Sequence, residues 1–198
     1  MPTDLASDGG ADRGDTVSDD ESGPEHLALA AGVQALVRMP SMRSPLSVLP
    51  DAAFENLLVV SATRPPGAVE RRVRERGGDP ERVGVVPVSG SPVDYDGPMW
   101  TSDAVTPANL SGISDRVGEA TRYVKPGVGW VVFDNVNVPL MYADRSGVQG
   151  LVRSVASQAR GRDARGVFSV VPGALAQGTY RSLAESFDLT LDRTDGES

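Results

Sequence analysis

The carboxylate of Asp134 directly follows an apolar run, and this position makes it the first candidate for chemistry. Residues 128–133 carry no charge and do not alternate between apolar and polar side chains. A strand with one face in water would alternate, so the pattern predicts a central strand that is buried on both faces. Ligands of parallel sheets bind beyond the carboxyl ends of the strands. Asp134 is therefore placed either to hold a metal ion or to cap a turn.

A loop with basic and hydroxyl side chains supplies the second group of candidates. It follows a strand expected at residues 33–37, and its Arg38, Ser41, Arg43 and Ser44 are the side chains that could contact a phosphate. Residues 39–46 contain neither the glycines nor the lysine with which a phosphate loop cradles a nucleotide. We therefore expect a degenerate phosphate loop at this position.

The lone lysine of the chain does not repair this loop. Lys125 is the only lysine among 19 basic residues, and it directly precedes Pro126. That position is the amino end of the central strand, opposite the end that carries Asp134. Lys125 is therefore too far away to act as a displaced phosphate-loop lysine.

Several kinds of site are excluded by residue counts. The chain has no cysteine, which rules out disulfides, thiolate metal sites and cysteine nucleophiles. His26 is the only histidine, so a site built from several histidines is excluded as well. We expect no catalytic residue, and Asp134 as the only metal-ligand candidate, a remnant of a lost site.

Charge and hydropathy narrow the class of partner. The net charge of −8 argues against nucleic acid, which requires a basic face to neutralise phosphates. No apolar run reaches the roughly 20 residues that a membrane span requires. The acidic start of the chain does not resemble a secretory signal. These features predict a cytoplasmic protein that has no membrane contact.

Composition divides the chain into three parts. Residues 1–24 contain seven acidic residues and one arginine among Gly, Ser and Thr, and they are expected to be a disordered acidic tail. Residues 25–192 are long enough for a single domain with its own core. Residues 193–198 are expected to fray.

Apolar runs alternate with helical patterns along this domain, which predicts one doubly wound, mainly parallel sheet with helices on both faces. The strand order is not evident from the sequence. The expected strands are residues 33–37, 56–61, 83–88, 128–133, 166–171 and 187–191. The expected helices are residues 68–76, 107–124, 145–160 and 179–185, with a short helical lead-in at 25–31, a short or broken helix between Pro45 and Pro50, and a short turn or helix at 136–143.

Two further segments have both a structural and a functional interpretation. The loop at 89–107 is longer than most connections, and its Tyr95 and Trp100 either cover the core or contact a ligand or partner. The helix at 68–76 carries four arginines beside two glutamates, which is typical of a solvated face, and phosphate binding is the functional alternative.

The order of these pieces resembles the KaiC-like branch of the RecA superfamily. More closely, it resembles haloarchaeal RecA/KaiC-like proteins of unknown function that are often labelled as transducer-like, and the low lysine content agrees with a salt-loving source. The resemblance covers about residues 31–192. It depends on residues 56–61, 109–113, 131–136 and 140–142 in that order.

The resemblance implies a function that the residues then qualify. Active relatives bind ATP and magnesium, and Asp134 would correspond to their Walker B carboxylate. The acidic residue that usually follows the second strand is replaced here by Ala62, Thr63 and Arg64. Without the phosphate cradle, the lysine and this acid, phosphoryl transfer is not expected.

We therefore expect a non-catalytic RecA/KaiC-like domain without a cofactor. It would act as a regulatory or protein-binding module, and signalling is the role usually assigned to such relatives. It would work with a protein partner or as a homo- or hetero-oligomer. The alternative is a nucleotide-binding protein or weak ATPase, which would hold ATP and magnesium through Arg38, Ser41, Arg43, Ser44 and Asp134. A third possibility is a recombination accessory that binds single-stranded DNA, which the acidic charge balance opposes.

Overall fold

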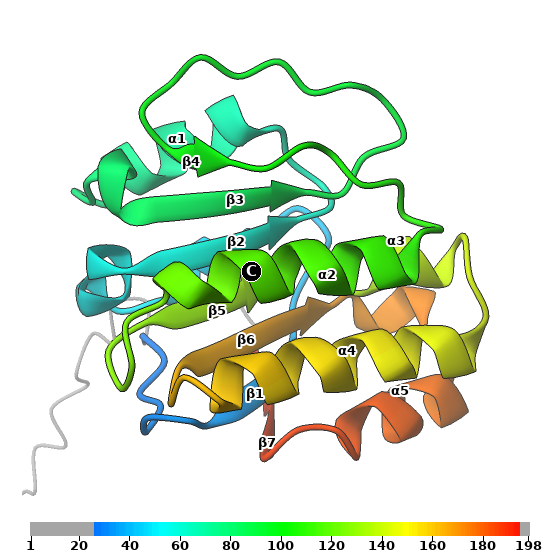
Figure 1. Ribbon diagram of the computed structural model, residues 1–198. Helices are drawn as coiled ribbons and strands as arrows, with labels where there is room; N and C mark the ends of the chain where they lie inside the picture. The colour runs from blue at the N-terminus through cyan, green and yellow to red at the C-terminus, as the bar shows by residue number, and fades with distance from the viewer. Residues whose placement is uncertain (1–25, 195–198) are drawn as a thin grey trace, which may run out of the picture.

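The computed structural model describes residues 26–194, which form one seven-stranded sheet with helices packed on both faces (Figure 1). The strand order is β4-β3-β2-β5-β6-β1-β7, and all neighbouring strands are parallel. This confirms the predicted α/β class and the doubly wound, parallel sheet. The strands are β1 (Gln34–Arg38), β2 (Leu57–Ser61), β3 (Val83–Pro87), β4 (Trp100–Thr101), β5 (Trp130–Phe133), β6 (Arg165–Val170) and β7 (Leu189–Asp192).

The central position of β5 explains its uncharged sequence. Three strands lie on each side of it, and all four of its residues are buried. Trp130 and Val132 belong to the core on one face of the sheet, whereas Val131 and Phe133 belong to the core on the other face. Because neither face meets water, no position on this strand favours a polar side chain.

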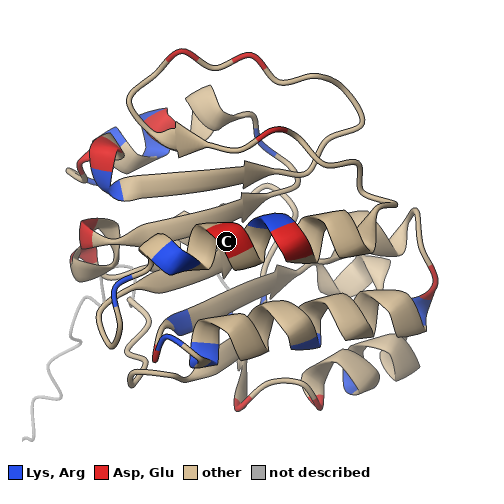
Figure 2. Cartoon of the chain, viewed as in Figure 1, with Lys and Arg blue, Asp and Glu red and all other residues tan. Residues whose placement is uncertain are grey.

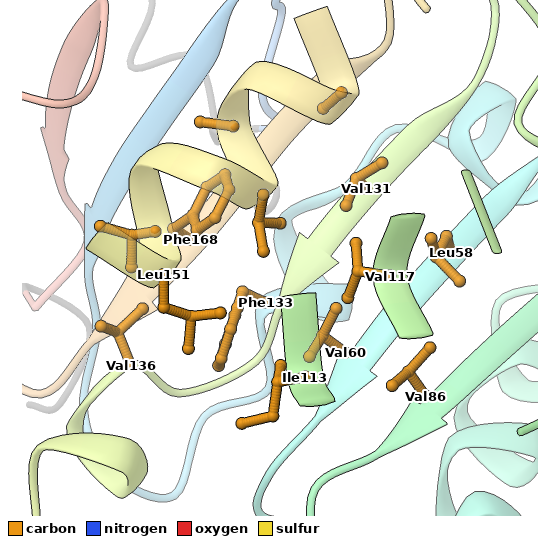
Figure 3. Close-up of a cluster of buried hydrophobic side chains, with 14 of the residues drawn as sticks. Leu58, Val60, Val86, Ile113, Val117, Val131, Phe133, Val136, Leu151 and Phe168 are labelled. Atoms are coloured by element: carbon orange, nitrogen blue, oxygen red, sulfur yellow. The ribbon is translucent and has the colours of Figure 1, made fainter. Parts of the chain in front are cut away.

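Two hydrophobic cores lie on opposite faces of the sheet. The larger one packs α2, α4 and α5 against the strands, and Phe133 and Phe168 stack within it with ring centroids 6.2 Å apart (Figure 3). The smaller one packs α1, η1 and η2 against the other face. The α-helices are α1 (Pro66–Glu75), α2 (Leu110–Ala120), α3 (Asn137–Leu140), α4 (Arg145–Arg160) and α5 (Gln177–Ala184). Short 3-10 helices are η1 (Pro45–Val48), η2 (Asp51–Glu55), η3 (Pro80–Arg82), η4 (Thr121–Tyr123) and η5 (Pro172–Ala174).

Side-chain caps fix the starts of the two longest helices. The Asp144 carboxylate accepts a hydrogen bond from the Gly147 N–H at 2.8 Å, so α4 begins at Arg145 as predicted. The Asn109 side chain accepts one from the Gly112 N–H at 2.9 Å, so α2 begins at Leu110. The predicted helix over 107–124 is therefore wrong at both ends, because this cap sets its start and its last turn tightens into η4.

Two other predictions require correction. The segment from His26 to Ala30 is not helical, because the buried Leu27 donates its N–H to the Val48 carbonyl and Gly32 adopts a positive φ of 79°. The loop at 89–107 is not wholly irregular, since β4 lies within it and pairs with β3. A strand of two residues leaves no periodic signal in a sequence.

Some predictions concern residues beyond the described range. The acidic tail at 1–24, Glu25 of the expected lead-in and residues 195–198 of the expected frayed end lie outside it. At the described end of the chain, the Arg193 N–H donates to the Arg38 carbonyl at 2.9 Å.

Candidate functional site

The candidate site lies where the connections of two neighbouring strands diverge. β2 and β5 are paired, but β2 leads to α1 on one face of the sheet and β5 leads to α4 on the other (Figure 1). Such a switch point is where doubly wound sheets place their ligands. Ser61 ends β2 and Asp134 follows β5, so both side chains lie at this point.

The Asp134 carboxylate is buried and accepts hydrogen bonds from the turn that follows β2. Its Oδ1 accepts a hydrogen bond from the Ala62 N–H at 2.7 Å. Its Oδ2 accepts bonds from the hydroxyls of Thr63 at 2.9 Å and Ser61 at 3.1 Å, and from the Thr63 N–H at 3.4 Å. Four donors from three consecutive residues therefore surround one carboxylate, which joins β5 to the turn after β2.

This arrangement shows how Asp134 serves a turn. Asp134 caps a turn, but the turn belongs to the neighbouring strand. The turn that follows β5 is capped by Asn135, whose Oδ1 accepts from the Asn137 N–H at 2.9 Å. The backbone of Asp134 is held on its other side by β6, because the Ser169 hydroxyl donates to the Asp134 carbonyl.

The burial of Asp134 changes its acidity. Loss of water around the carboxyl raises its pKa above the ordinary value. The hydrogen bonds from Ala62, Thr63 and Ser61 act in the opposite direction and offset part of this rise. The Arg64 guanidinium lies 4.0 Å from Oδ2 and is partly exposed.

The loop at the expected phosphate position is a closed turn. The Arg43 N–H donates to the Pro40 carbonyl at 3.1 Å, and the Met39 side chain is buried in the smaller core. Ser44 is buried and caps η1 by accepting a hydrogen bond from the Leu46 N–H at 3.3 Å. Pro40 and Pro45 have no N–H to offer.

Few backbone donors therefore remain for an anion in this loop. The Met39 N–H is used as well, because it donates to the Val170 carbonyl at 2.9 Å. A phosphate cradle depends on successive N–H groups that converge on one point. The segment from Met39 to Leu46 does not have that form.

The structure separates the side chains that could have contacted a phosphate. The Arg38 guanidinium pairs with Asp192 of β7 at 2.7 Å and lies 5.5 Å from the centre of the Tyr180 ring, so it faces away from β5. Arg43 donates to the Ser47 hydroxyl at 3.4 Å, and Ser41 is exposed in the turn. Ser44 serves η1, so these four residues do not converge with Asp134.

The residues that do meet Asp134 were not singled out as site residues from the sequence. Ser61, Thr63 and Ser169 all lie at carboxyl ends of β2 or β6, and they contact Asp134 only because both strands flank β5. Arg64 joins the same corner by donating to the Met42 carbonyl at 3.5 Å. Hydroxyl side chains at the ends of apolar strands are the sequence signal that could identify these residues. To show that they meet Asp134, however, the strand order has to be known.

Three large apolar side chains are exposed at the same edge of the sheet. The exposed fraction is 89% for Met42, 77% for Met141 and 60% for Tyr142. Met42 lies in the turn after β1, and the other two follow α3 beyond β5. Figure 2 shows that the strands themselves carry almost no charge and that acidic and basic residues gather on helices and loops.

Between residues 26 and 194, no three His, Cys, Asp or Glu side chains come together as metal ligands. Within the same range, none of the helices combines the length and the apolar character that crossing a membrane requires.

Comparison with known proteins gives a family. A model described as a family of unknown function, DUF7504, matches residues 48–192. The chain belongs to this family. The DUF7504 match includes Ser61, Thr63 and Asp134 but begins after the turn at 39–46. No curated protein matches the chain.

Solved structures share the fold of this DUF7504 member. One similar structure is of a protein from Pyrococcus horikoshii OT3 that is described only as the subject of a structural study. It has a TM-score of 0.51 and 14% identity, and the match covers 84% of each chain. At this identity the likeness shows the α/β fold alone, because one fold serves many functions.

Proposed function

We propose that this protein is a non-catalytic RecA/KaiC-like domain that works as a regulatory or protein-binding module in the cytoplasm, with signalling as its context. The proposal is supported chiefly by one observation, the occupation of the switch point by the protein itself. Asp134 accepts four hydrogen bonds from the turn after β2, and these would have to be broken before a metal ion could use its oxygens.

The turn at 39–46 supports the same conclusion independently. Catalysis of phosphoryl transfer depends on donors positioned around the phosphates and on a metal ion that neutralises charge. Here the buried Ser44 caps η1, and Arg38 is paired with Asp192. Neither residue is free to hold a triphosphate without local rearrangement.

The exposed side chains at this edge favour a protein partner. Methionine and tyrosine are enriched in protein interfaces, and patches of exposed apolar groups mark interaction sites. Met42, Met141 and Tyr142 supply such groups beside the occupied switch point. A partner could thus use the edge of the fold that ligands use in related architectures.

Thermal unfolding with and without Mg-ATP, in high salt, tests the proposal. A ligand that binds only the native state at a concentration of 100 Kd adds about 2.7 kcal/mol of stability. For a domain of this size that gain would raise the Tm by several degrees, roughly 2–4 °C per kcal/mol. We expect no shift beyond that given by Mg²⁺ and by sodium triphosphate alone.

A saturable rise in Tm that is specific for ATP would overturn the proposal in favour of a nucleotide-binding protein or weak ATPase. The variants Arg43→Ala and Ser41→Ala would then identify the loop as the site, because they should abolish the shift. Arg71→Ala, on the exposed face of α1, is the control that should leave it intact.

A further inference from the structure

A recess lies at the amino ends of the strands, at the opposite end of the sheet from Asp134. A cavity of about 250 Å³ is bounded by the amino ends of β2 and β3, by β4 and by the end of α2. Leu58, Gly84 and Val124 form part of its apolar wall, and Trp100, Tyr123 and Glu81 also line it. None of these residues belongs to the switch point.

The two aromatic rings are exposed because the fold has no helix to cover them. The connection from β3 to β4 is a loop, so β4 ends the sheet without a crossover helix of its own (Figure 1). Trp100 is 44% exposed and Tyr123 is 75% exposed. Parallel sheets normally bury both faces, so the exposed indole on β4 departs from the usual arrangement.

A glycine positions the indole on the sheet. A Cβ at Gly84 would lie 3.3 Å from Cε3 of Trp100 and 3.4 Å from Cδ1 of Leu58, so the indole packs closely over this backbone. The ring centroids of Trp100 and Tyr123 are 6.2 Å apart, and the ring planes are inclined at 42°. The two rings therefore form two walls of a corner rather than a flat stack.

Two of the residues that line the cavity carry a charge, Glu81 and Arg82. Among residues 26–194, the Glu81 carboxylate forms no ion pair. The neighbouring Arg82 is already paired twice, with Glu55 and with Asp79, the latter at 3.6 Å. Among the described residues that line the cavity, Glu81 is thus the charged side chain without an ion-pair partner. On the other side Arg162 donates to the Val124 carbonyl at 2.9 Å, so the preference for a cation depends on Glu81.

We propose that this cavity binds a small organic cation that carries a quaternary ammonium group. The faces of Trp and Tyr rings attract such cations through their quadrupoles, and alkyl groups on the nitrogen suit an apolar wall. Glu81 supplies the counter-charge. At about 30 Å³ for each water-sized group, the cavity holds roughly eight non-hydrogen atoms. That size fits a free molecule as small as choline.

Ligand-observed NMR titration of the full-length protein tests this site. The probes are choline and its uncharged isostere, dimethylbutanol, in which carbon replaces the ammonium nitrogen, with ionic strength held constant by sodium chloride. We expect saturable binding of choline, and at least about threefold weaker binding of the isostere, as a cation–π contribution at a partly exposed site predicts. Equal binding of the two probes, or no saturable binding of choline, would overturn the proposal.

Variants locate the binding within the protein. Trp100→Leu and Tyr123→Leu keep an apolar wall and should each weaken choline binding at least about threefold. Glu81→Gln keeps the shape and should weaken it most at low salt. Tyr142→Leu removes an exposed tyrosine at the other edge and should change nothing. Thermal unfolding of each variant without ligand verifies that it is folded, and an equal loss in Tyr142→Leu would assign the effect to general surface binding.

Discussion

The Asp134 carboxylate accepts the Ala62 backbone N–H at 2.7 Å, which joins residues that are 72 positions apart in the sequence. The bond crosses from β5 to the turn after β2 at the point where the two connections diverge. Together with the bonds from the Ser61 and Thr63 hydroxyls, it joins the carboxyl ends of two paired strands. The most direct predictions concern this contact.

Removal of the carboxylate should destabilise the protein markedly. Asp134→Ala leaves two backbone N–H groups and the Thr63 hydroxyl without this acceptor, whereas the Ser61 hydroxyl keeps the Arg64 carbonyl at 2.8 Å. Unsatisfied buried donors cost about 1–3 kcal/mol each when water cannot reach them. We expect a loss of about 2–4 kcal/mol in the free energy of unfolding, measured by urea denaturation. Asp103→Ala, at an exposed ion pair, should stay within about 0.5 kcal/mol. Similar losses in both variants would contradict the role given to Asp134.

The dependence of stability on pH should distinguish Asp134→Asn from the native chain. Burial raises the folded-state pKa of Asp134, so its proton is held more tightly in the folded state than in the unfolded state. Stability linked to this group is therefore fully present below the unfolded pKa of about 3.9 and is lost as pH rises through the folded pKa.

Relative to Asp134→Asn, the native protein should thus lose stability as pH rises from about 4, by about 1.4 kcal/mol for each unit by which the pKa is raised. Urea denaturation of both proteins across this range measures the difference, in which the other titrating groups cancel. If the native protein instead gained stability relative to the variant, the four hydrogen bonds would outweigh burial and the pKa would be lowered.

Arg76 should contribute far more to the free energy of unfolding than the other three arginines of residues 68–76. The prediction that all four form a solvated face is wrong for Arg76, which donates to the carbonyls of Leu46, Ser47 and Leu49 at 2.8–3.1 Å and lies over the Phe54 ring. It thereby ties the end of α1 to η1 and η2. Arg76→Ala should cost about 1–3 kcal/mol by urea denaturation, because three carbonyls lose a charged donor.

The matched control for Arg76 is Arg72, which is half-exposed and pairs with Glu75 on the surface of the same helix. Arg72→Ala should cost no more than about 0.5 kcal/mol, as exposed ion pairs usually do. Equal costs for the two variants would show that the three carbonyl contacts contribute nothing to stability.

The proposed partner-binding edge can be tested by surface substitution. Met42→Ser, Met141→Ser and Tyr142→Ser replace exposed apolar groups, so they should leave the Tm nearly unchanged. Affinity purification of the tagged protein, with quantitative mass spectrometry, should show at least one partner that the triple variant loses about tenfold or more. Val128→Ser, an exposed apolar group at the opposite edge, is the control that should retain it. Retention of every partner by the triple variant would refute this surface.

Much of the fold could be predicted because its signals are local. The helix expected at about 145–160 agrees with α4, because its apolar stripe is a local signal and that stripe faces one core. The central strand was evident because both of its faces are buried. β4 could not be predicted, because two residues show no periodicity, and the lead-in at 25–31 was predicted wrongly because its contact with Val48 is tertiary.

The site was less accessible to sequence reasoning than the fold. Asp134 could be found because it ends an apolar run, and the turn at 39–46 could be recognised by what it lacks. The partners of Asp134 could not be named, because Ser61 and Thr63 become its neighbours only when β2 pairs with β5. The different surroundings of Arg72 and Arg76 likewise depend on where η1 and η2 pack.

The position of β1 has a consequence for how the chain is made. Both neighbours of β1 come from the last part of the sequence: Gln34 aligns with Gly166 of β6, and Ala35 aligns with Leu189 of β7. β1 is therefore synthesised before both of its partners, and its backbone can be paired on both sides only after β7 has been made. During synthesis this apolar segment has unpaired edges, and contacts between such distant residues form slowly. Completion of the sheet therefore has to follow the synthesis of β7, and the interval before it is when the nascent chain is most prone to aggregate.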